Sequence, residues 1–220
     1  MSFDLLAPHY RWMEWLLAGG KLQRCRTACL GSIPVPAKVL IYGEGNGRFL
    51  AALCRQFPEA EVTSVDASAR MIELARRRLD RHGLQSAKVR FVHADALDWT
   101  PPATTYDLIV THFFLDCFRL DQLRQLVPVI AGAAKPRAHW LLADFKTAGS
   151  GFRRRRSQFI LALMYLFFRQ AARLPARTLT PPDEFLLAAG FSRHQQVEMD
   201  WGMLHSDCWR RQARQAGRWS

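Results

Sequence analysis

The sequence predicts a doubly wound α/β domain, in which a mostly parallel sheet of seven strands carries helices on both faces. The first observation behind this prediction is that short apolar segments alternate with amphipathic segments from residue 37 onward. The second is the length of 220 residues, which suits one large domain. The third is a composition of 49% hydrophobic and 23% charged residues, which supplies a core and excludes disordered and fibrous proteins.

The alternation assigns the elements of the first half in order. A short apolar run bounded by turn signals predicts a buried strand, and apolar residues three and four apart predict a helix. Strands are predicted at 38–42, 61–65, 88–93 and 106–111, and helices at 48–57 and 68–81. Ser68 is suited to cap the second helix and Gly83 to end it. Because such strands are joined by right-handed crossovers, they form a parallel sheet covered on both faces.

The second half completes the sheet after one interruption. The pattern predicts a helix capped by Asp121 and ending at 130, a strand at 138–143, a helix from Pro182 or Asp183 to 189, and strands near 194–199 and 202–206. We therefore expect a single domain over 1–220, divided into an N-terminal helical cap (1–36), a core (37–144), a helical insertion (145–180), closing elements (181–209) and a basic tail (210–220).

Charge and cysteine content bear on partners and compartment. The formal net charge is +12 and most of the excess lies in residues 111–220, which favours an anionic partner such as a nucleic acid, a lipid headgroup or an acidic substrate. The alternative is a genomic bias toward arginine. Five cysteines without a Cys-x-x-Cys pair predict neither a disulfide framework nor a metal site. Without a secretion signal or an apolar run long enough to span a bilayer, we expect a cytoplasmic protein, peripheral at a membrane at most.

The most informative segment is the glycine loop, Gly43-Glu44-Gly45-Asn46-Gly47, which follows the first strand and precedes a helix. Glycines at such a turn adopt backbone angles closed to other residues and let a ligand touch the main chain. A dinucleotide-binding loop would place its third glycine where this chain has Arg48, so the spacing disfavours a nicotinamide oxidoreductase. A tight turn without a ligand is the alternative interpretation.

Two aspartates follow neighbouring strands of the predicted sheet. Asp66 ends the second strand about 20 residues after the glycine loop, where a carboxylate can accept hydrogen bonds from both hydroxyls of a ribose. The alternative role for Asp66 is to cap the helix that follows. Asp95 comes directly after the third strand. The carboxyl ends of parallel strands are where open α/β sheets bind ligands, so these positions predict a ligand site.

With these residues the chain resembles the class I S-adenosylmethionine (SAM)-dependent methyltransferases. The matching segments span 38–144 and are, in order, Gly43-Glu44-Gly45-Asn46-Gly47-Arg48, Val62-Thr63-Ser64-Val65-Asp66-Ala67-Ser68, Ala94-Asp95-Ala96 and Tyr106-Asp107-Leu108-Ile109-Val110-Thr111. The opening Phe3-Asp4-Leu5-Leu6-Ala7-Pro8-His9-Tyr10 is similar to the start of the branch that modifies small molecules and quinones, where this helix lies over the cofactor.

The resemblance implies a Rossmann-like fold and a set of cofactor contacts. Gly43, Gly45 and Gly47 would border the methionine part of SAM, Asp66 would hold the ribose hydroxyls, and Asp95 with Ala96 would contact adenine. The other positions expected to line this site are Tyr10, Ala67 and Thr111. The chain departs from the family at Ile41, where members usually carry an acid that organises the loop and the amino group of the cofactor. Glu44 is the candidate substitute.

Candidate residues for the methyl acceptor follow the fourth strand. His112 is a candidate general base, and Asp116 is a candidate to orient it or to bind the acceptor. Asp144, at the end of the fifth strand, is a further candidate. The alternatives are a satisfied buried histidine, a solvated loop for Asp144 and an inert core position for Cys117. The motifs of adenine amino-methylation and of covalent cytosine methylation are absent from this segment.

The insertion over 152–174 combines four consecutive arginines with an aromatic- and methionine-rich run. Its place in the family implies an acceptor pocket and lid, and its composition favours an apolar acceptor. The run Arg153, Arg154, Arg155 and Arg156 is a candidate for an anionic membrane surface. A buried helix, or one that forms a homo-oligomer, is the alternative.

We therefore expect a SAM-dependent methyltransferase that acts on a small hydrophobic acceptor, quinone-, aromatic- or lipid-like, and releases S-adenosylhomocysteine (SAH). RNA methylation is the first alternative, favoured by the net charge and disfavoured by the missing base-specific motifs. A non-catalytic, SAM-binding subunit that activates a partner is the second, because of the departure at Ile41.

Overall fold

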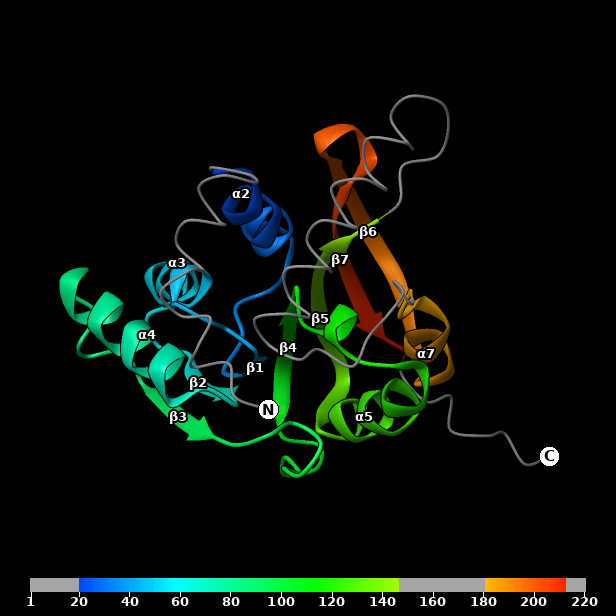
Figure 1. Cartoon of the computed structure of the whole chain (residues 1–220), viewed down its shortest axis with the longest axis horizontal. Coiled ribbons are helices and arrows are strands. Elements are labelled where there is room, and N and C mark those ends of the chain that lie inside the picture. Colours follow the sequence, from blue (N-terminus) through cyan, green and yellow to red (C-terminus); the bar gives the residue numbers. More distant parts are fainter. Residues whose placement is uncertain (1–19, 147–180, 213–220) are drawn as a thin grey trace.

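A computed structural model describes residues 20–146 and 181–212. These residues form one seven-stranded sheet in the order β3-β2-β1-β4-β5-β7-β6, with helices on both faces (Figure 1). Every neighbouring pair of strands from β3 to β5 is parallel, and β7 runs antiparallel to both β5 and β6. The predicted doubly wound, mostly parallel sheet is confirmed.

The elements have the following bounds. The strands are β1 (Lys38–Tyr42), β2 (Glu61–Asp66), β3 (Val89–His93), β4 (Tyr106–His112), β5 (Ala134–Phe145), β6 (Phe191–Met199) and β7 (Leu204–Arg211). The helices are α2 (Lys21–Thr27), α3 (Arg48–Gln56), α4 (Ala69–Arg81), α5 (Leu120–Gly132) and α7 (Asp183–Ala188). Three short 3-10 turns are η2 (Leu30–Ser32), η3 (Leu115–Cys117) and η4 (Asp200–Gly202).

Alternate residues of the strands build two separate cores. In β1, Val39 and Ile41 pack with α3 and α4, while Leu40 and Tyr42 pack with α5 and α7. Both sets are at most 1% exposed, as expected for a parallel strand covered on both faces. Figure 1 shows α2, α3 and α4 on one side of the sheet and α5 and α7 on the other. The apolar runs that predicted the strands therefore contribute side chains to both cores.

Strand β7 corrects the expected boundary of the basic tail. The predicted strand ended at 206, but β7 continues to Arg211, which pairs in register with Phe191 of β6. Strand β5 is also longer than predicted and pairs with β7 from Phe145 back to His139. Main-chain hydrogen bonds between strands do not require apolar side chains, so a run of basic residues can extend a strand.

The predicted cap of α4 is confirmed, and the predicted cap of α5 is wrong. The Ser68 hydroxyl accepts a hydrogen bond from Met71 N at 3.1 Å and caps α4, as predicted. Asp121 does not cap α5, which begins at Leu120, one residue earlier. Its carboxylate instead pairs with the Arg119 guanidinium at 2.9 Å. The cap residue is Arg119 in place of Asp121, so a shift of the helix start by two residues makes Asp121 a member of a surface ion pair.

The described helices include none that is long and apolar enough to cross a membrane. All five cysteines are free thiols, as the sequence indicates. The expected helical cap is described only from residue 20 onward, and Tyr10, the helical insertion and its arginine run Arg153–Arg156 lie outside the described residues.

Candidate active site

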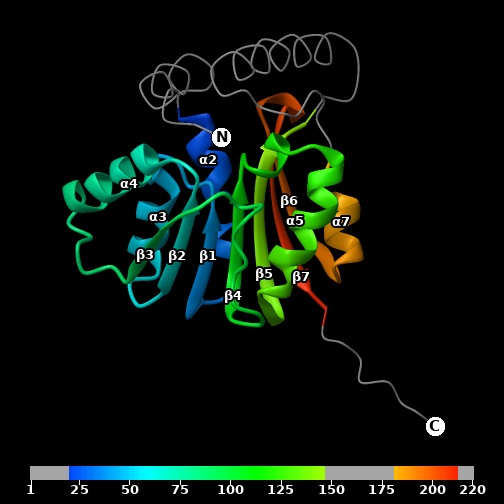
Figure 2. The ribbon, with the colours of Figure 1, turned by 60° about the horizontal axis from the view of Figure 1, so that its bottom comes forward.

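The carboxyl ends of the parallel strands lie along one edge of the sheet, the upper edge in Figure 2, where α2 also lies. The glycine loop follows β1, Asp66 ends β2, Asp95 follows β3, and His112 ends β4. Asp144 lies one residue before the end of β5. The fold thus brings to one edge candidate residues that are up to 100 positions apart in the sequence.

The three glycines of the loop all have positive φ, but for different reasons. A Cβ on Gly43 (φ +63°) would lie 2.5 Å from Cδ2 of Phe114, and one on Gly47 (φ +81°) would lie 2.7 Å from the Cα of Ala75. Packing against the protein itself therefore requires glycine at both positions. Gly45 has φ +67° at the middle of the loop. The backbone conformation alone excludes most side chains there.

Asp66 fastens the middle of this loop to the end of β2. Its Oδ2 accepts a hydrogen bond from Gly45 N at 3.1 Å, and its Oδ1 accepts one from Ser68 N at 2.9 Å. The helix cap is Ser68, so the capping alternative for Asp66 is wrong. Each carboxylate oxygen has a second lone-pair site. The carboxylate is thus held in place by backbone donors at the end of β2.

Glu44 turns back toward the start of α3. Its Oε1 accepts a hydrogen bond from Leu50 N at 2.9 Å, which compensates for Gly47, the cap residue without a side chain. Burial raises the pKa of Glu44 to about 7, against the opposing effects of this hydrogen bond and of the nearby Arg26 charge. Glu44 therefore has a structural role at α3, and its carboxyl remains beside the loop.

The adenine side of the expected site lies after β2 and β3. Asp95 is partly exposed, and its Oδ1 accepts a hydrogen bond from Leu97 N at 3.1 Å. Ala96 is 7% exposed and belongs to the core on the α5 side, and Ala67 is partly exposed directly after β2. Small side chains at these positions leave room beside the strand ends.

The side chain of Thr111, one of the expected cofactor contacts, does not lie at the site edge. The side chain is fully buried within β4, and its Oγ1 accepts a hydrogen bond from Trp140 Nε1 at 2.8 Å. The core on the α5 side therefore engages this hydroxyl. The position in the family motif suggested the site edge, but the alternation of β4 turns the side chain inward.

His112 lies on the other side of β4 from Thr111. Its ring meets Phe49 edge to face at 4.4 Å between centroids, and within residues 20–146 and 181–212 neither ring nitrogen has a hydrogen-bond partner. Burial, followed by the positive charge of Arg26, holds the pKa of His112 well below its ordinary value. His112 is thus a neutral imidazole, 7% exposed. The expectation of a satisfied core histidine is wrong.

The sequence suggested that Asp116 orients His112, but the structure shows a different partner for Asp116. It hydrogen bonds instead to Asp144, which is 2% exposed and whose Oδ1 also accepts a bond from Phe145 N at 2.8 Å. Burial raises the pKa of both carboxyls. The charge of Asp116 raises the pKa of Asp144 further, whereas the hydrogen bond with Asp144 lowers the pKa of Asp116. We call these two residues the acid pair. They share a proton as one unit.

Cys117 borders the acid pair and packs, partly buried, against the core on the α5 side, in line with the expected inert core position. Its thiol lies 3.5 Å from Asp116 Oδ1. Burial and the neighbouring acids raise the pKa of Cys117 well above its ordinary value. The side chain therefore stays a neutral thiol and is a poor nucleophile.

Two polar side chains at this edge were not predicted from the sequence. Asp207 of β7 is fully buried, and its Oδ2 lies 3.1 Å from His205 Nδ1. Arg26 of α2 is only 6% exposed. A signal for Arg26 was available, because helical spacing places it beside Cys25 and Cys29, both of which are fully buried.

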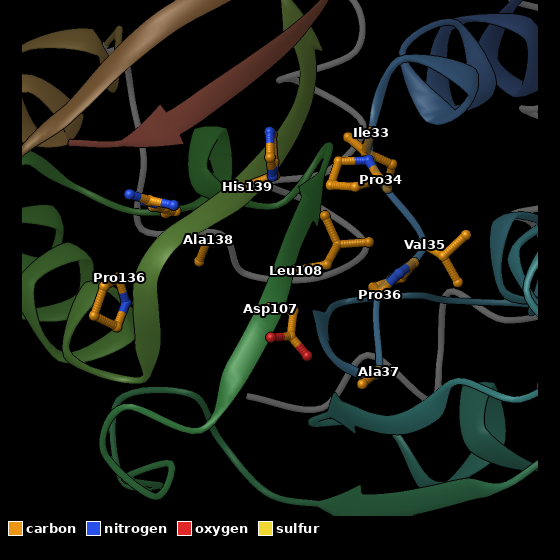
Figure 3. A pocket seen from close by; sticks show the side chains of 11 residues that line it. Ile33, Pro34, Val35, Pro36, Ala37, Asp107, Leu108, Pro136, Ala138 and His139 are labelled. Carbon is orange, nitrogen blue, oxygen red and sulfur yellow. The ribbon is translucent and has the colours of Figure 1, made fainter. Parts of the chain in front are cut away.

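A separate cavity of about 270 Å³ lies at the opposite edge of the sheet (Figure 3). It is formed by the segment 33–37 before β1, by the start of β4 at Asp107 and Leu108, and by residues 136–139 of β5. Asp107 is engaged there by Lys135 at 2.9 Å. The cavity is remote from the strand ends that carry the candidate residues. In the described part of the chain no three acidic, histidine or cysteine side chains are grouped to hold a metal ion.

Comparison with known proteins agrees with the geometry. Residues 39–137 match the family described as "Methyltransferase domain". The chain is 40% identical over 76 residues to a release factor glutamine methyltransferase of Chlorobaculum tepidum, which covers 34% of this chain and 25% of the relative. It is 33% identical over 113 residues to the demethylmenaquinone methyltransferase of Thermus thermophilus, which covers 50% of each.

Among solved structures, the mitomycin 7-O-methyltransferase is similar with a TM-score of 0.69 at 20% identity, over 96% of this chain and 61% of that one. The chain thus spans a quarter to about three fifths of the length of these proteins. They share the chemistry in their names and differ in the acceptor. Residues 39–137 therefore correspond to a methyltransferase domain, and the described sheet has the Rossmann-like fold of class I methyltransferases.

Proposed function

We propose that this chain is a methyltransferase that uses SAM to methylate a small hydrophobic acceptor with a quinone-, aromatic- or lipid-like body. The observation that carries the proposal is the carboxylate of Asp66, held at the end of β2 against Gly45 of the glycine loop. This arrangement suits a ribose hydroxyl pair beside a main chain that a ligand can approach closely. The partly exposed Asp95 and Ala67 continue the same surface toward an adenine.

The preference for an apolar acceptor is supported by the aromatic side chains around the end of β4. Phe114 stacks on Tyr42 at 5.5 Å and meets Phe118 at 5.0 Å, on the α5 side. Phe113 meets Phe145 at 5.0 Å on the α2 side. Aromatic walls of this kind favour planar, apolar ligands. The demethylmenaquinone methyltransferase of Thermus thermophilus acts on an acceptor of this class.

Phe113 separates the two aromatic groups. Its φ is +52°, in the left-handed region that a phenylalanine rarely adopts. Such strain costs about 1–3 kcal/mol and occurs preferentially at functional sites. In this chain the turn sends two consecutive rings to opposite sides of the strand end. The proposed acceptor surface therefore depends on a locally strained backbone.

SAM supplies an already activated methyl group, so the chain has to orient the acceptor, exclude water and accept a proton from a hydroxyl or amine. We assign the proton to the acid pair. Asp116 is its partly exposed member and would meet the acceptor, while the buried Asp144 would position Asp116. As the new bond to carbon forms, the acceptor O–H or N–H bond breaks and its proton passes to the Asp116 carboxylate. His112 is the second candidate base, since both of its nitrogens are free of hydrogen bonds.

Thermal unfolding tests the cofactor part of the proposal. At 100-fold excess over its dissociation constant, one ligand adds about 2.7 kcal/mol. For a domain of this size that raises Tm by roughly 5–10 °C. We expect this shift with SAH and none with NADH. Cooperative unfolding with no shift by SAH would contradict the proposal.

Transfer of a labelled methyl group from SAM tests the acceptor. The probes are a demethylmenaquinol, the reduced dihydroxy form of the quinone, with a shortened side chain and total RNA, incubated separately with the full chain. We expect label on the quinone and none on RNA, with Asp116→Asn reducing the rate by at least 100-fold and His112→Gln by less than 10-fold. The reverse order of the two variants would assign the base to His112, and label on RNA alone would replace the small-molecule acceptor.

A further inference from the structure

Strand β7 carries a buried histidine–aspartate dyad that the proposed chemistry has not yet used. Nδ1 of His205 lies 3.1 Å from Oδ2 of Asp207, two residues further along the strand. His205 is 6% exposed and Asp207 is fully buried. Burying two titratable groups is costly, because both lose their hydration. Buried titratable pairs of this kind concentrate at functional sites.

The dyad lies on the same face of the sheet as the acid pair. Strand β7 runs between β5 and β6 (Figure 1), and His205 is directly opposite Asp144 in the antiparallel register of β5 and β7. Residues opposite each other in such a pair share a face, with their Cβ atoms about 4.5–5.5 Å apart. Asp207 follows two positions after His205 and points to this face as well. Burial and neighbouring acids, Asp207 among them, raise the pKa of Asp144, so the dyad and the acid pair interact electrostatically.

Strand β6 supplies the charged groups on the other side of the dyad. Nε of Arg193 lies 3.6 Å from Oδ2 of Asp207 and compensates its charge. Glu198 is opposite His205 and pairs with Lys146 at 2.9 Å at the surface. Because a carboxylate only accepts hydrogen bonds, the neutral ring donates from Nδ1 and keeps a free lone pair on Nε2. The dyad thus places a base between the acid pair and the exposed side of the sheet.

The acid pair has to lose one proton in every catalytic cycle. It shares one proton at rest, so the proton taken from the acceptor is its second, and a pair with two protons cannot accept another. The acceptor, and then its methylated product, covers the open side of Asp116. The proton therefore has to leave by way of Asp144, which is itself 2% exposed and has His205 as its neighbour on β7.

We propose that His205, oriented by Asp207, takes this proton from Asp144 and releases it to solvent. The inference rests on the proposed function and adds a proton outlet to the same site. The O–H bond of Asp144 breaks as an N–H bond forms at Nε2 of His205. The acid pair is left with its single shared proton, and an imidazolium stands beside the Asp207 carboxylate. Loss of the Nε2 proton to water restores the neutral ring. Both residues of the dyad are positioning residues, because they act through the acid pair and do not touch the acceptor.

Rapid-quench kinetics separate the first turnover from the later ones. The full chain is mixed with labelled SAM and the demethylmenaquinol probe, and label on the probe is followed from the first turnover into the steady state. For His205→Gln we expect a first turnover within about twofold of the wild type, and later turnovers slower by roughly 10- to 100-fold. The label then appears as a burst of one methyl group per chain. Asp116→Asn should instead slow both phases.

Added imidazole distinguishes a proton outlet from a structural role, because a soluble base can replace the missing ring. Imidazole should restore the later turnovers of His205→Gln in proportion to its concentration and leave the wild type unchanged. Asp207→Asn should slow the later turnovers less, since the ring remains and only its carboxylate is lost. The matched control is His194→Gln, which replaces an exposed histidine of β6 and should change neither phase.

The possible results either support or overturn the inference. Equal slowing of first and later turnovers by His205→Gln assigns the dyad a structural role and overturns it, as do unchanged later turnovers or a slowing that imidazole does not restore. If His205→Gln loses cooperative unfolding, Asp207→Asn decides, and only slowing confined to its later turnovers supports the inference. A wild type that labels no quinol, or an Asp116→Asn variant as fast as the wild type, contradicts the proposed function itself, and the proton outlet fails with it.

Discussion

The two halves of the site edge satisfy their polar groups in different ways. After β1 and β2, the carboxylates of Asp66 and Glu44 accept hydrogen bonds from backbone N–H groups of the loop and of α3. After β4 and β5, no described residue forms a hydrogen bond with the ring of His112. Asp116 and Asp144 form hydrogen bonds with each other and with their immediate neighbours in the chain. The first half is ordered by main-chain donors, and the second contains buried titratable groups whose pKa values are displaced.

This difference suits two different tasks. Backbone donors fix a carboxylate at little entropic cost, which is what binding a constant ligand requires. Unsatisfied and proton-sharing groups cost stability, and such groups concentrate where protons are moved. The comparison assigns cofactor binding to the β1–β2 side and acceptor chemistry to the β4–β5 side, and it can be tested by variants on each side.

The largest effect is expected from Gly47→Ala, on the cofactor side. The new Cβ would lie 2.7 Å from the Cα of Ala75 and the residue would keep φ near +81°. Overlap with backbone and left-handed strain together should cost about 3 kcal/mol in the free energy of unfolding, measured in urea. The control is Gly83→Ala, at φ +68° with open space around it, which should cost about 1 kcal/mol. Equal costs would mean that the contact of the loop with α4 does not matter.

The next effect concerns Asp66→Ala. Removing the carboxylate should weaken SAH binding by about 100-fold, or about 2.7 kcal/mol, because two charge-assisted hydrogen bonds to the ribose are lost. The measurement is a calorimetric titration. Asp98→Ala, an exposed position after β3, is the matched control and should leave the affinity unchanged. A loss of less than threefold for Asp66→Ala would remove the ribose contact from the proposal.

Asp144→Asn should show the opposite behaviour on the acceptor side, with a gain in stability. A raised pKa means that the folded state holds the proton more tightly, so the stabilisation is present at low pH and is lost as pH rises above the ordinary range of an aspartate. The asparagine keeps an acceptor for Phe145 N and does not ionise. We expect the variant to match the wild type at pH 4 and to be the more stable of the two at pH 8, measured by urea unfolding.

The control for this prediction is Asp121→Asn. The exposed pair with Arg119 lowers the pKa of Asp121, so its stabilisation is present above the ordinary pKa and lost as pH falls. The variant should be slightly less stable at pH 8 and equal at pH 3. A gain at pH 8 for both variants would show that net charge, and not the acid pair, sets the pH dependence.

The smallest effect is expected from Glu44→Gln. This variant tests the difference between the two sides, because Glu44 lies on the cofactor side and yet has a raised pKa, like the acid pair on the acceptor side. Its pKa of about 7 implies stabilisation that is complete below pH 4.5 and is lost as pH rises through 7. Partial exposure of the side chain screens this effect to about 1 kcal/mol. The free energy of unfolding of the variant should therefore fall less steeply between pH 6 and 8 than that of the wild type, and an unchanged slope would contradict the raised pKa of Glu44.

The sequence predicted the fold and the cofactor side well because both depend on local rules. The glycine spacing, the aspartates after strands and Ser68 as a cap all follow from backbone geometry that one segment determines. The errors in these predicted elements are small. The start of α5 is shifted by two residues relative to a cap at Asp121, and β7 extends further than predicted because basic residues pair within the sheet.

The acceptor side could not be predicted to the same extent. Whether His112 has a partner depends on which face of β4 it occupies and on what α3 and α2 bring to that face. The bond between Asp116 and Asp144 joins residues 28 positions apart, and the burial of Arg26 depends on helix docking. Such relations arise from tertiary packing, which no local pattern encodes.

The attachment of α2 has a consequence for the order in which this molecule is assembled during synthesis. The thiols of Cys25 and Cys29 donate to carbonyls of His205 and Ser206, which are 180 and 177 residues further along the chain. Helix α2 emerges from the ribosome before the strands, yet these carbonyls do not exist until β7 has been translated. Closing so long a loop makes docking of α2 a late step. A nascent chain that has completed β1 to β5 therefore still lacks Arg26 at its edge.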